Sequence, residues 1–99
     1  MNKLLISLLT LSLVSCASVP PYWTKTSEPA TSYRWWVVSR YDLISICGVG
    51  VEACAWQNPG GICNIFSYMS EEQAKYTFLT HRTIVRNHEL KHCEGYMHP

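Results

Sequence analysis

The spacing of the histidines near the carboxy terminus is the feature that most restricts how this chain can fold. His88 and His92 are four residues apart, so on a helix their side chains lie one turn apart on the same face. Gly95 follows three residues later, where helices commonly end with a left-handed glycine. Such a turn can bring His98 back toward the helical pair. We therefore predict a helix that ends at Gly95 and carries three converging histidines.

These residue types suit a catalytic zinc site. Three imidazole ligands, from His88, His92 and His98, leave one position on Zn²⁺ open for water, whereas structural zinc sites usually have four protein ligands. Glu89 lies about 100° around the helix from His88, beside the metal rather than on it. A carboxylate placed there can take a proton from water that zinc activates. We predict one bound Zn²⁺, with Glu89 as the general base.

The stretch from His88 to His98 reads H-E-x-x-H-x-x-G-x-x-H. It resembles the active-site motif of the metzincin clan of zinc metallopeptidases. The resemblance implies a zincin-like fold and hydrolysis of a peptide bond. Residue by residue, it implies zinc ligands at His88, His92 and His98, a general base at Glu89 and a turn glycine at Gly95.

The resemblance covers about a tenth of the chain and has one clear departure. Metzincins place a methionine turn after the third histidine, whereas Met97 precedes His98 and cannot form that turn. In such peptidases an edge strand of the sheet pairs with an extended substrate. Residues 53–56 or 62–68 could have this role here.

The amino terminus is predicted to be a removable signal. A charged start precedes the apolar residues 4–14, which are too few to cross a bilayer. Leu13 to Cys16 resembles the lipobox of bacterial lipoproteins, which implies that residues 1–15 are removed and Cys16 is acylated. In Gram-negative lipoproteins of this kind, a residue such as Ala17 in place of Asp favours the outer membrane. Ordinary cleavage, which would leave a soluble secreted protein, is the alternative.

Residues 16–32 contain three prolines and six serines or threonines without a hydrophobic period. This composition predicts a stiffened tether. Tyr22 and Trp23 within it could rest at the membrane interface or against the domain, and the sequence leaves both open. The folded domain is predicted to span residues 33–99.

The domain is predicted to be α+β. Residues 33–39 are aromatic and β-branched, as in a strand, whereas the apolar residues 43–47 have no clear type. Residues 53–56 and 62–68 flank a turn-rich Gln-Asn-Pro-Gly-Gly segment and predict a β-hairpin in an antiparallel or mixed sheet. Ser70 begins a capping box. From Thr80 the helical spacing that leads to the histidines begins.

Five cysteines in a short exported chain predict a disulfide-stapled fold. With Cys16 lipidated, the remaining four would form two disulfides, and three pairings are open. We favour Cys54 with Cys63 across the hairpin, and Cys47 with Cys93, which would fix the metal-bearing helix to the sheet.

Composition restricts the function. With 47% hydrophobic and 15% charged residues, the chain is not of the disordered class. Loss of Lys3 with the signal leaves seven basic and seven acidic side chains, which gives no basic field for nucleic acid. The partners we expect are a peptide or protein substrate, including peptidoglycan peptides.

Two functions follow from the sequence. The first is a lipid-anchored zinc metallopeptidase of the cell envelope, facing the periplasm or the cell surface. Because some sixty-seven residues cannot hold a second lobe, a protein partner could complete its cleft. The alternative is a non-catalytic envelope lipoprotein with a structural zinc, acting as an interaction or exclusion factor. Cys93, His81 or the terminal carboxylate as a fourth zinc ligand would favour this alternative.

Overall fold

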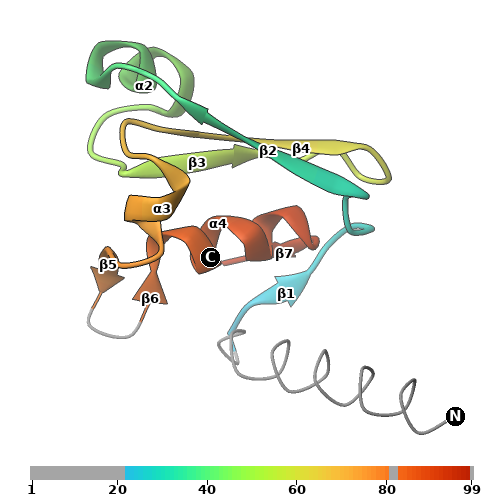
Figure 1. Ribbon diagram of the computed structural model, residues 1–99. Helices are drawn as coiled ribbons and strands as arrows, with labels where there is room; N and C mark the ends of the chain where they lie inside the picture. The colour runs from blue at the N-terminus through green and yellow to red at the C-terminus, as the bar shows by residue number, and fades with distance from the viewer. Residues whose placement is uncertain (1–21, 81–82, 99) are drawn as a thin grey trace, which may run out of the picture.

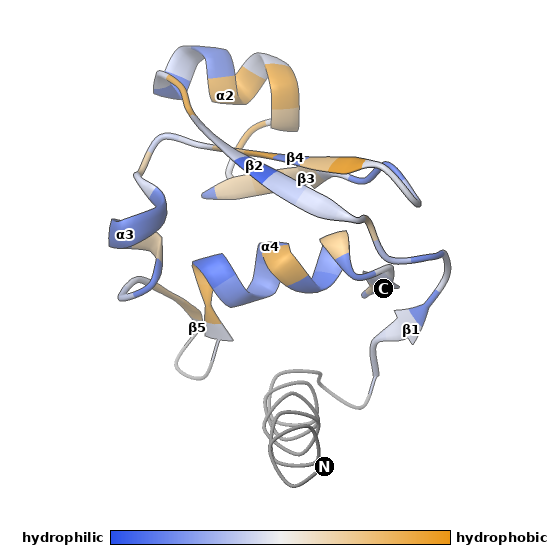
Figure 2. Cartoon of the chain, turned by 45° about the vertical axis from the view of Figure 1, so that its right-hand side comes forward, coloured by the Kyte–Doolittle hydropathy of each residue, from blue (hydrophilic) through white to orange (hydrophobic). Residues whose placement is uncertain are grey.

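The computed structural model describes residues 22–80 and 83–98. The predicted signal peptide, residues 1–15, and Cys16 lie outside the described residues. A three-stranded sheet lies between helix α2 on one face and helix α4 on the other (Figures 1 and 2). The elements are β1 (Thr24–Lys25), β2 (Ser32–Val37), α2 (Arg40–Cys47), β3 (Ala53–Trp56), β4 (Ile62–Ser67), α3 (Glu71–Ala74), β5 (Phe78–Thr80), β6 (Thr83–Ile84), α4 (Val85–Cys93) and β7 (Tyr96–Met97).

The central sheet has the strand order β2-β4-β3. Strands β3 and β4 form the predicted antiparallel hairpin, and β2 runs parallel to β4. The sheet is therefore mixed, and the predicted α+β class is confirmed. Because β4 is central, β3 offers one free edge of this sheet and residues 62–67 do not.

Serine side chains cap two of the helices. The segment whose type the sequence left open is helix α2, where Ser39 Oγ accepts a hydrogen bond of 3.0 Å from the Asp42 N–H. Ser70 Oγ accepts from the Gln73 N–H at 3.1 Å, as the capping box predicts, and begins the short helix α3. Both caps satisfy an amide that has no partner within its helix.

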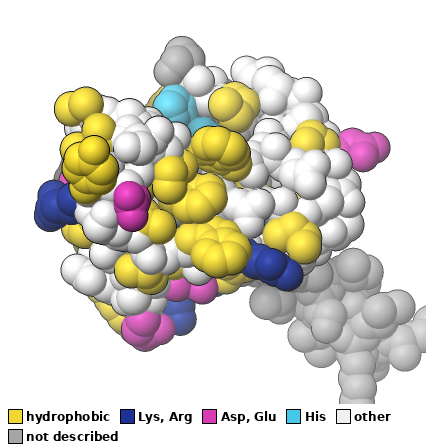
Figure 3. Space-filling view, turned by 90° about the horizontal axis from the view of Figure 1, so that it is seen from above, with side chains coloured by type: hydrophobic (Ala, Val, Ile, Leu, Met, Phe, Trp, Pro, Cys, Tyr) yellow, Lys and Arg dark blue, Asp and Glu magenta, His cyan; other side chains and the backbone are white. Residues whose placement is uncertain are grey.

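The two faces of the sheet differ in their burial. On the face toward α4, Cys63 and Ile65 are fully buried and pack with Cys93. On the opposite face, Trp36 and Trp56 contact Phe66 and are each about half-exposed. Figure 3 views the molecule from that side and shows hydrophobic side chains gathered over it, with histidine at one edge. The core thus lies between the sheet and α4.

Two disulfides form as predicted, but their pairing differs from the one we favoured. The bonds join Cys47 to Cys54 and Cys63 to Cys93. The register places Cys54 opposite Phe66, three residues from Cys63, so these cysteines project from opposite faces of the sheet. Cys54 therefore bonds to α2 above the sheet, and Cys63 bonds to α4 below it.

The folded unit begins earlier than the predicted boundary at residue 33. Strand β1 pairs antiparallel with β7, opposing Thr24 to Met97. Further along, Thr26 N–H donates to the Gly95 carbonyl and Ala30 N–H to the Cys93 carbonyl, each at 2.8 Å. The described part of the predicted tether is thus packed along the segment that follows α4.

Candidate metal centre

Helix α4 presents the predicted histidines. It begins at Val85, after β6, because Ile84 is still extended, so the helix is shorter than the spacing from Thr80 suggested. The Val85 N–H donates to the Thr77 carbonyl at 2.8 Å, which satisfies the first amide of the helix. At the other end Gly95 has φ +99°, the left-handed turn that the sequence predicts.

Three histidines converge on one point. The ligand nitrogens of His88, His92 and His98 all lie within 4.8 Å of one another. His92 Nδ1 is 2.9 Å from the Tyr96 carbonyl oxygen, so this nitrogen carries the proton and donates. Its Nε2 therefore has a free electron pair, and it lies 3.3 Å from His88 Nε2. The described residues thus provide a three-nitrogen site that could hold a metal ion.

The surroundings keep two of these imidazoles neutral. Burial, with the neighbouring His92 and His98, lowers the pKa of His88 from 6.5 to about 4. Burial also lowers the pKa of His92, against the opposing hydrogen bond to Tyr96. Both rings are consequently neutral near pH 7, with one nitrogen free of a proton, which is the form that binds metal.

Glu89 occupies a position that faces the core. It lies between Val85 and Cys93 at four-residue spacing on α4, and all three are buried. Only 4% of Glu89 is exposed, and within the described chain its Oε1 has no hydrogen-bond partner. Burial raises the pKa of Glu89 from 4.5 to about 7, because the charged form is poorly solvated there.

The histidines and Glu89 open into one pocket of about 410 Å³. The pocket is also lined by the start and middle of β3, Ala53 to Ala55, and by the loop Gly50 to Glu52 just before it. Leu79 and Met97 add apolar surface. The edge strand β3 therefore lines the same pocket as the predicted base and the three histidines.

Gly95 is required for a second reason besides its backbone angle. A Cβ at this position would lie 2.1 Å from the carbonyl oxygen of Ser27. The close approach lets the amino-terminal segment lie directly on the turn that leads to His98. The predicted turn glycine thus also fits the chain that packs over it.

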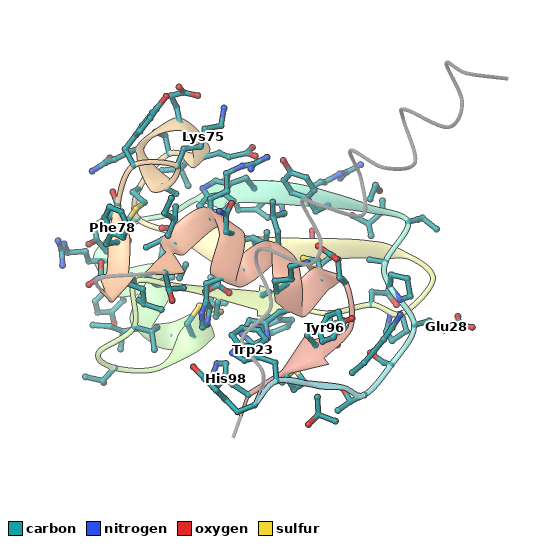
Figure 4. The ribbon with its side chains drawn as sticks, turned by 90° about the horizontal axis from the view of Figure 1, so that it is seen from below. Trp23, Glu28, Lys75, Phe78, Tyr96 and His98 are labelled. Carbon is teal, nitrogen blue, oxygen red and sulfur yellow. A yellow bond between two sulfur atoms is a disulfide. The ribbon has the colours of Figure 1, made fainter. Side chains whose placement is uncertain are left out.

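Trp23 is the residue at this centre to which the sequence assigned no role. Its indole is 8% exposed and contacts all three histidine rings, with centroids 4.9 Å from His88 and 5.0 Å from His92 and from His98. Figure 4 shows it beside His98. The available indication was a large aromatic side chain in an otherwise polar, proline-rich stretch.

Of the residues considered as a fourth ligand, the one that the structure describes does not join the three histidines. Cys93 is bonded to Cys63, so it offers no thiolate. His81 and the terminal carboxylate lie outside the described residues. Within the described ranges, the one cluster of metal-ligating side chains around this pocket is His88, His92 and His98.

Comparisons with protein-family models, curated proteins and solved structures find nothing that matches this chain. In residues 22–80 and 83–98, no helix has both the length and the apolar character needed to cross a bilayer.

Proposed function

We propose that this chain is a zinc-dependent metallopeptidase of the cell envelope. The observation that carries the proposal is the pocket shared by three converging histidines and the buried Glu89 carboxyl group, whose Oε1 has no hydrogen-bond partner among the described residues. A zincin-like arrangement, in which the histidine-bearing helix lies beneath an edge strand, belongs to the proposal. So does a lipid on Cys16 that anchors the chain, with Ala17 favouring the outer membrane.

The spacing of the His88 and His92 nitrogens suits zinc. Tetrahedral zinc with Zn–N bonds of about 2.0–2.1 Å places two ligand nitrogens about 3.3–3.4 Å apart. The Nε2 atoms of His88 and His92 are separated by 3.3 Å. With His98 these residues would hold the ion, which would supply Lewis acidity toward the carbonyl and make water more acidic.

The state of Glu89 supports catalysis over a purely structural site. Burial of a carboxyl oxygen without a hydrogen-bond partner, such as Glu89 Oε1 within the described residues, costs free energy, and a structural zinc site needs no such group. In the proposed reaction, Glu89, which lines the pocket, would accept a proton from the attacking water and pass it to the leaving amine. A cation held by the adjacent histidines favours the carboxylate form that this role requires.

The edge of β3 supports a peptide as substrate. An extended peptide can add to a free strand edge through main-chain hydrogen bonds. Ala53, Cys54 and Ala55 of this edge line the pocket beside Glu89. A peptide on β3 would run past the three histidines, whether it comes from an envelope protein or a peptidoglycan cross-link.

The test combines metal analysis with cleavage of both substrate classes by the purified full chain, and mass spectrometry detects the products. We expect one zinc per chain and cleavage that a chelator abolishes. Glu89→Gln should keep the zinc and lose at least about 100-fold in rate, as expected for loss of a general base. Glu72→Gln, on the exposed surface of α3, is the matched control and should cleave normally.

Full activity of Glu89→Gln would refute the role of Glu89. Stoichiometric zinc without cleavage of either substrate class would favour the alternative function, a non-catalytic lipoprotein with a structural zinc that acts as an interaction or exclusion factor.

A further inference from the structure

Trp23 packs against the three histidine rings without lining the pocket into which they open. The pocket is lined by His88, His92 and His98 but not by Trp23, although the indole lies about as close to each of these rings as they lie to one another. The three imidazoles therefore line the pocket and also pack against the indole of Trp23.

The backbone fixes the indole relative to His98. The antiparallel register opposes Thr24 to Met97 and Lys25 to Tyr96. Trp23 and His98 are each one residue beyond these paired positions, and Figure 4 shows their side chains near each other. The same pair of strands therefore positions the third histidine and Trp23.

The size of the side chain matches this task. Two fused rings reach three imidazoles at once, which a single six-membered ring does less completely. The indole Nε1 is buried and has no hydrogen-bond partner among the described residues. A phenylalanine would avoid the cost of burying this N–H group. The presence of tryptophan therefore indicates that the larger ring system matters at this position.

We propose that Trp23 is a positioning residue that preorganises the three imidazoles for metal binding. Packing against the indole limits the rotation of each ring and keeps the nitrogens converged before the ion arrives. Less ordering then accompanies binding, which raises affinity. This inference rests on the metal site of the proposed function, but it does not depend on peptide cleavage.

The test is a zinc titration of the full chain in competition with a chromogenic chelator. The variants are Trp23→Ala and Trp23→Phe, and Trp36→Ala is the matched control because Trp36 lies on the opposite face of the sheet, half-exposed. We expect Trp23→Ala to weaken zinc binding about 10- to 100-fold, the range typical of residues that orient metal ligands. Trp23→Phe should recover part of this loss, and Trp36→Ala should bind as the wild type does.

Cobalt supplies a readout that a general loss of stability would not move. We expect Co²⁺ to quench the fluorescence of wild-type Trp23, and Trp23→Phe to lose this component while the other three tryptophans remain. The visible Co²⁺ absorption of Trp23→Phe should also change shape, because the ligand geometry relaxes. Far-ultraviolet circular dichroism of the metal-free variants checks that they fold.

The positioning role would be overturned if folded Trp23→Ala bound zinc with wild-type affinity and gave an unchanged Co²⁺ spectrum. If the alanine variant does not fold, the same result in Trp23→Phe would overturn it. Absence of any metal binding by the wild type would overturn both this role and the proposed function. Metal binding that depends on Trp23, without peptide cleavage, would support the positioning role and refute the peptidase.

Discussion

At the scale of single residues, the candidate metal centre contains two residues that packing alone does not explain. Glu89 places a carboxyl group where α4 faces the core. Gly95 leaves room for the Ser27 carbonyl where any Cβ would clash. Both were predicted from the motif, but only the fold shows that each also faces a neighbouring segment.

Gly95→Ala should be among the most destabilising single changes in the chain. It combines the strain of φ +99° with a Cβ that lies 2.1 Å from the Ser27 oxygen, so we expect a loss of about 2–4 kcal/mol in the free energy of unfolding, measured with urea. Gly50→Ala is the matched control, because φ is +84° there but no atom lies within 4 Å of the added Cβ. Equal losses in the two variants would show that the contact with Ser27 is unimportant.

At the scale of elements, the sequence predicts those with a strong local pattern. The hairpin of β3 and β4 follows from its turn residues, and α4 follows from the spacing of its histidines. Strand β1 is not predicted, because two polar residues among prolines and serines have no local strand pattern. Its partner β7 lies about seventy residues away in the chain.

The disulfide pairing could not be predicted from the sequence for a related reason. Which cysteines meet depends on the face of the sheet from which each one projects, and a shift of register by one residue exchanges the faces. The register places Cys54 with α2 and Cys63 with α4. Local residue patterns indicate a hairpin but do not fix this register.

The two disulfides should differ in their effect. Cys63–Cys93 closes a loop of 30 residues and Cys47–Cys54 closes one of 7, so chain entropy predicts stabilisation of about 3.6 and about 2.4 kcal/mol respectively. We expect Cys63→Ala/Cys93→Ala to lose more stability in urea unfolding. It should also weaken zinc binding, because Cys93 adjoins His92. Equal zinc affinity in the two double variants would show that the Cys63–Cys93 disulfide does not influence zinc binding.

At the scale of the whole molecule, polar contacts supplement a thin core. The Tyr33 hydroxyl donates to Glu71 Oε2, and Arg86 Nε donates to the same oxygen at 2.9 Å. These residues come from β2, α3 and α4. Burial opposes ionisation of Glu71, but the hydrogen bonds from Tyr33 and Arg86 outweigh it and lower the pKa of Glu71 below 4.5.

This network should make stability fall in acid. A carboxyl group whose pKa is lowered by folding stabilises the protein above its unfolded pKa, and the contribution is lost as pH falls through the folded value. We expect Glu71→Gln to cost about 1 kcal/mol at neutral pH, after allowance for solvent screening. It should also flatten the decline in stability below about pH 4.5, the ordinary value. Glu72→Gln, with a side chain 70% exposed, is the control, and an identical acid profile for the two variants would contradict the prediction.

The packing of β1 also limits the distance between Cys16 and the candidate metal centre. Trp23 is only seven positions after Cys16, and it lies against the three histidines. Fully extended, seven residues span about 25 Å at most. If Cys16 carries the proposed lipid, the centre works within a thin layer at the bilayer surface. Its substrates would then be polypeptides that enter that layer, so the short segment between Cys16 and Trp23 would contribute to substrate selection.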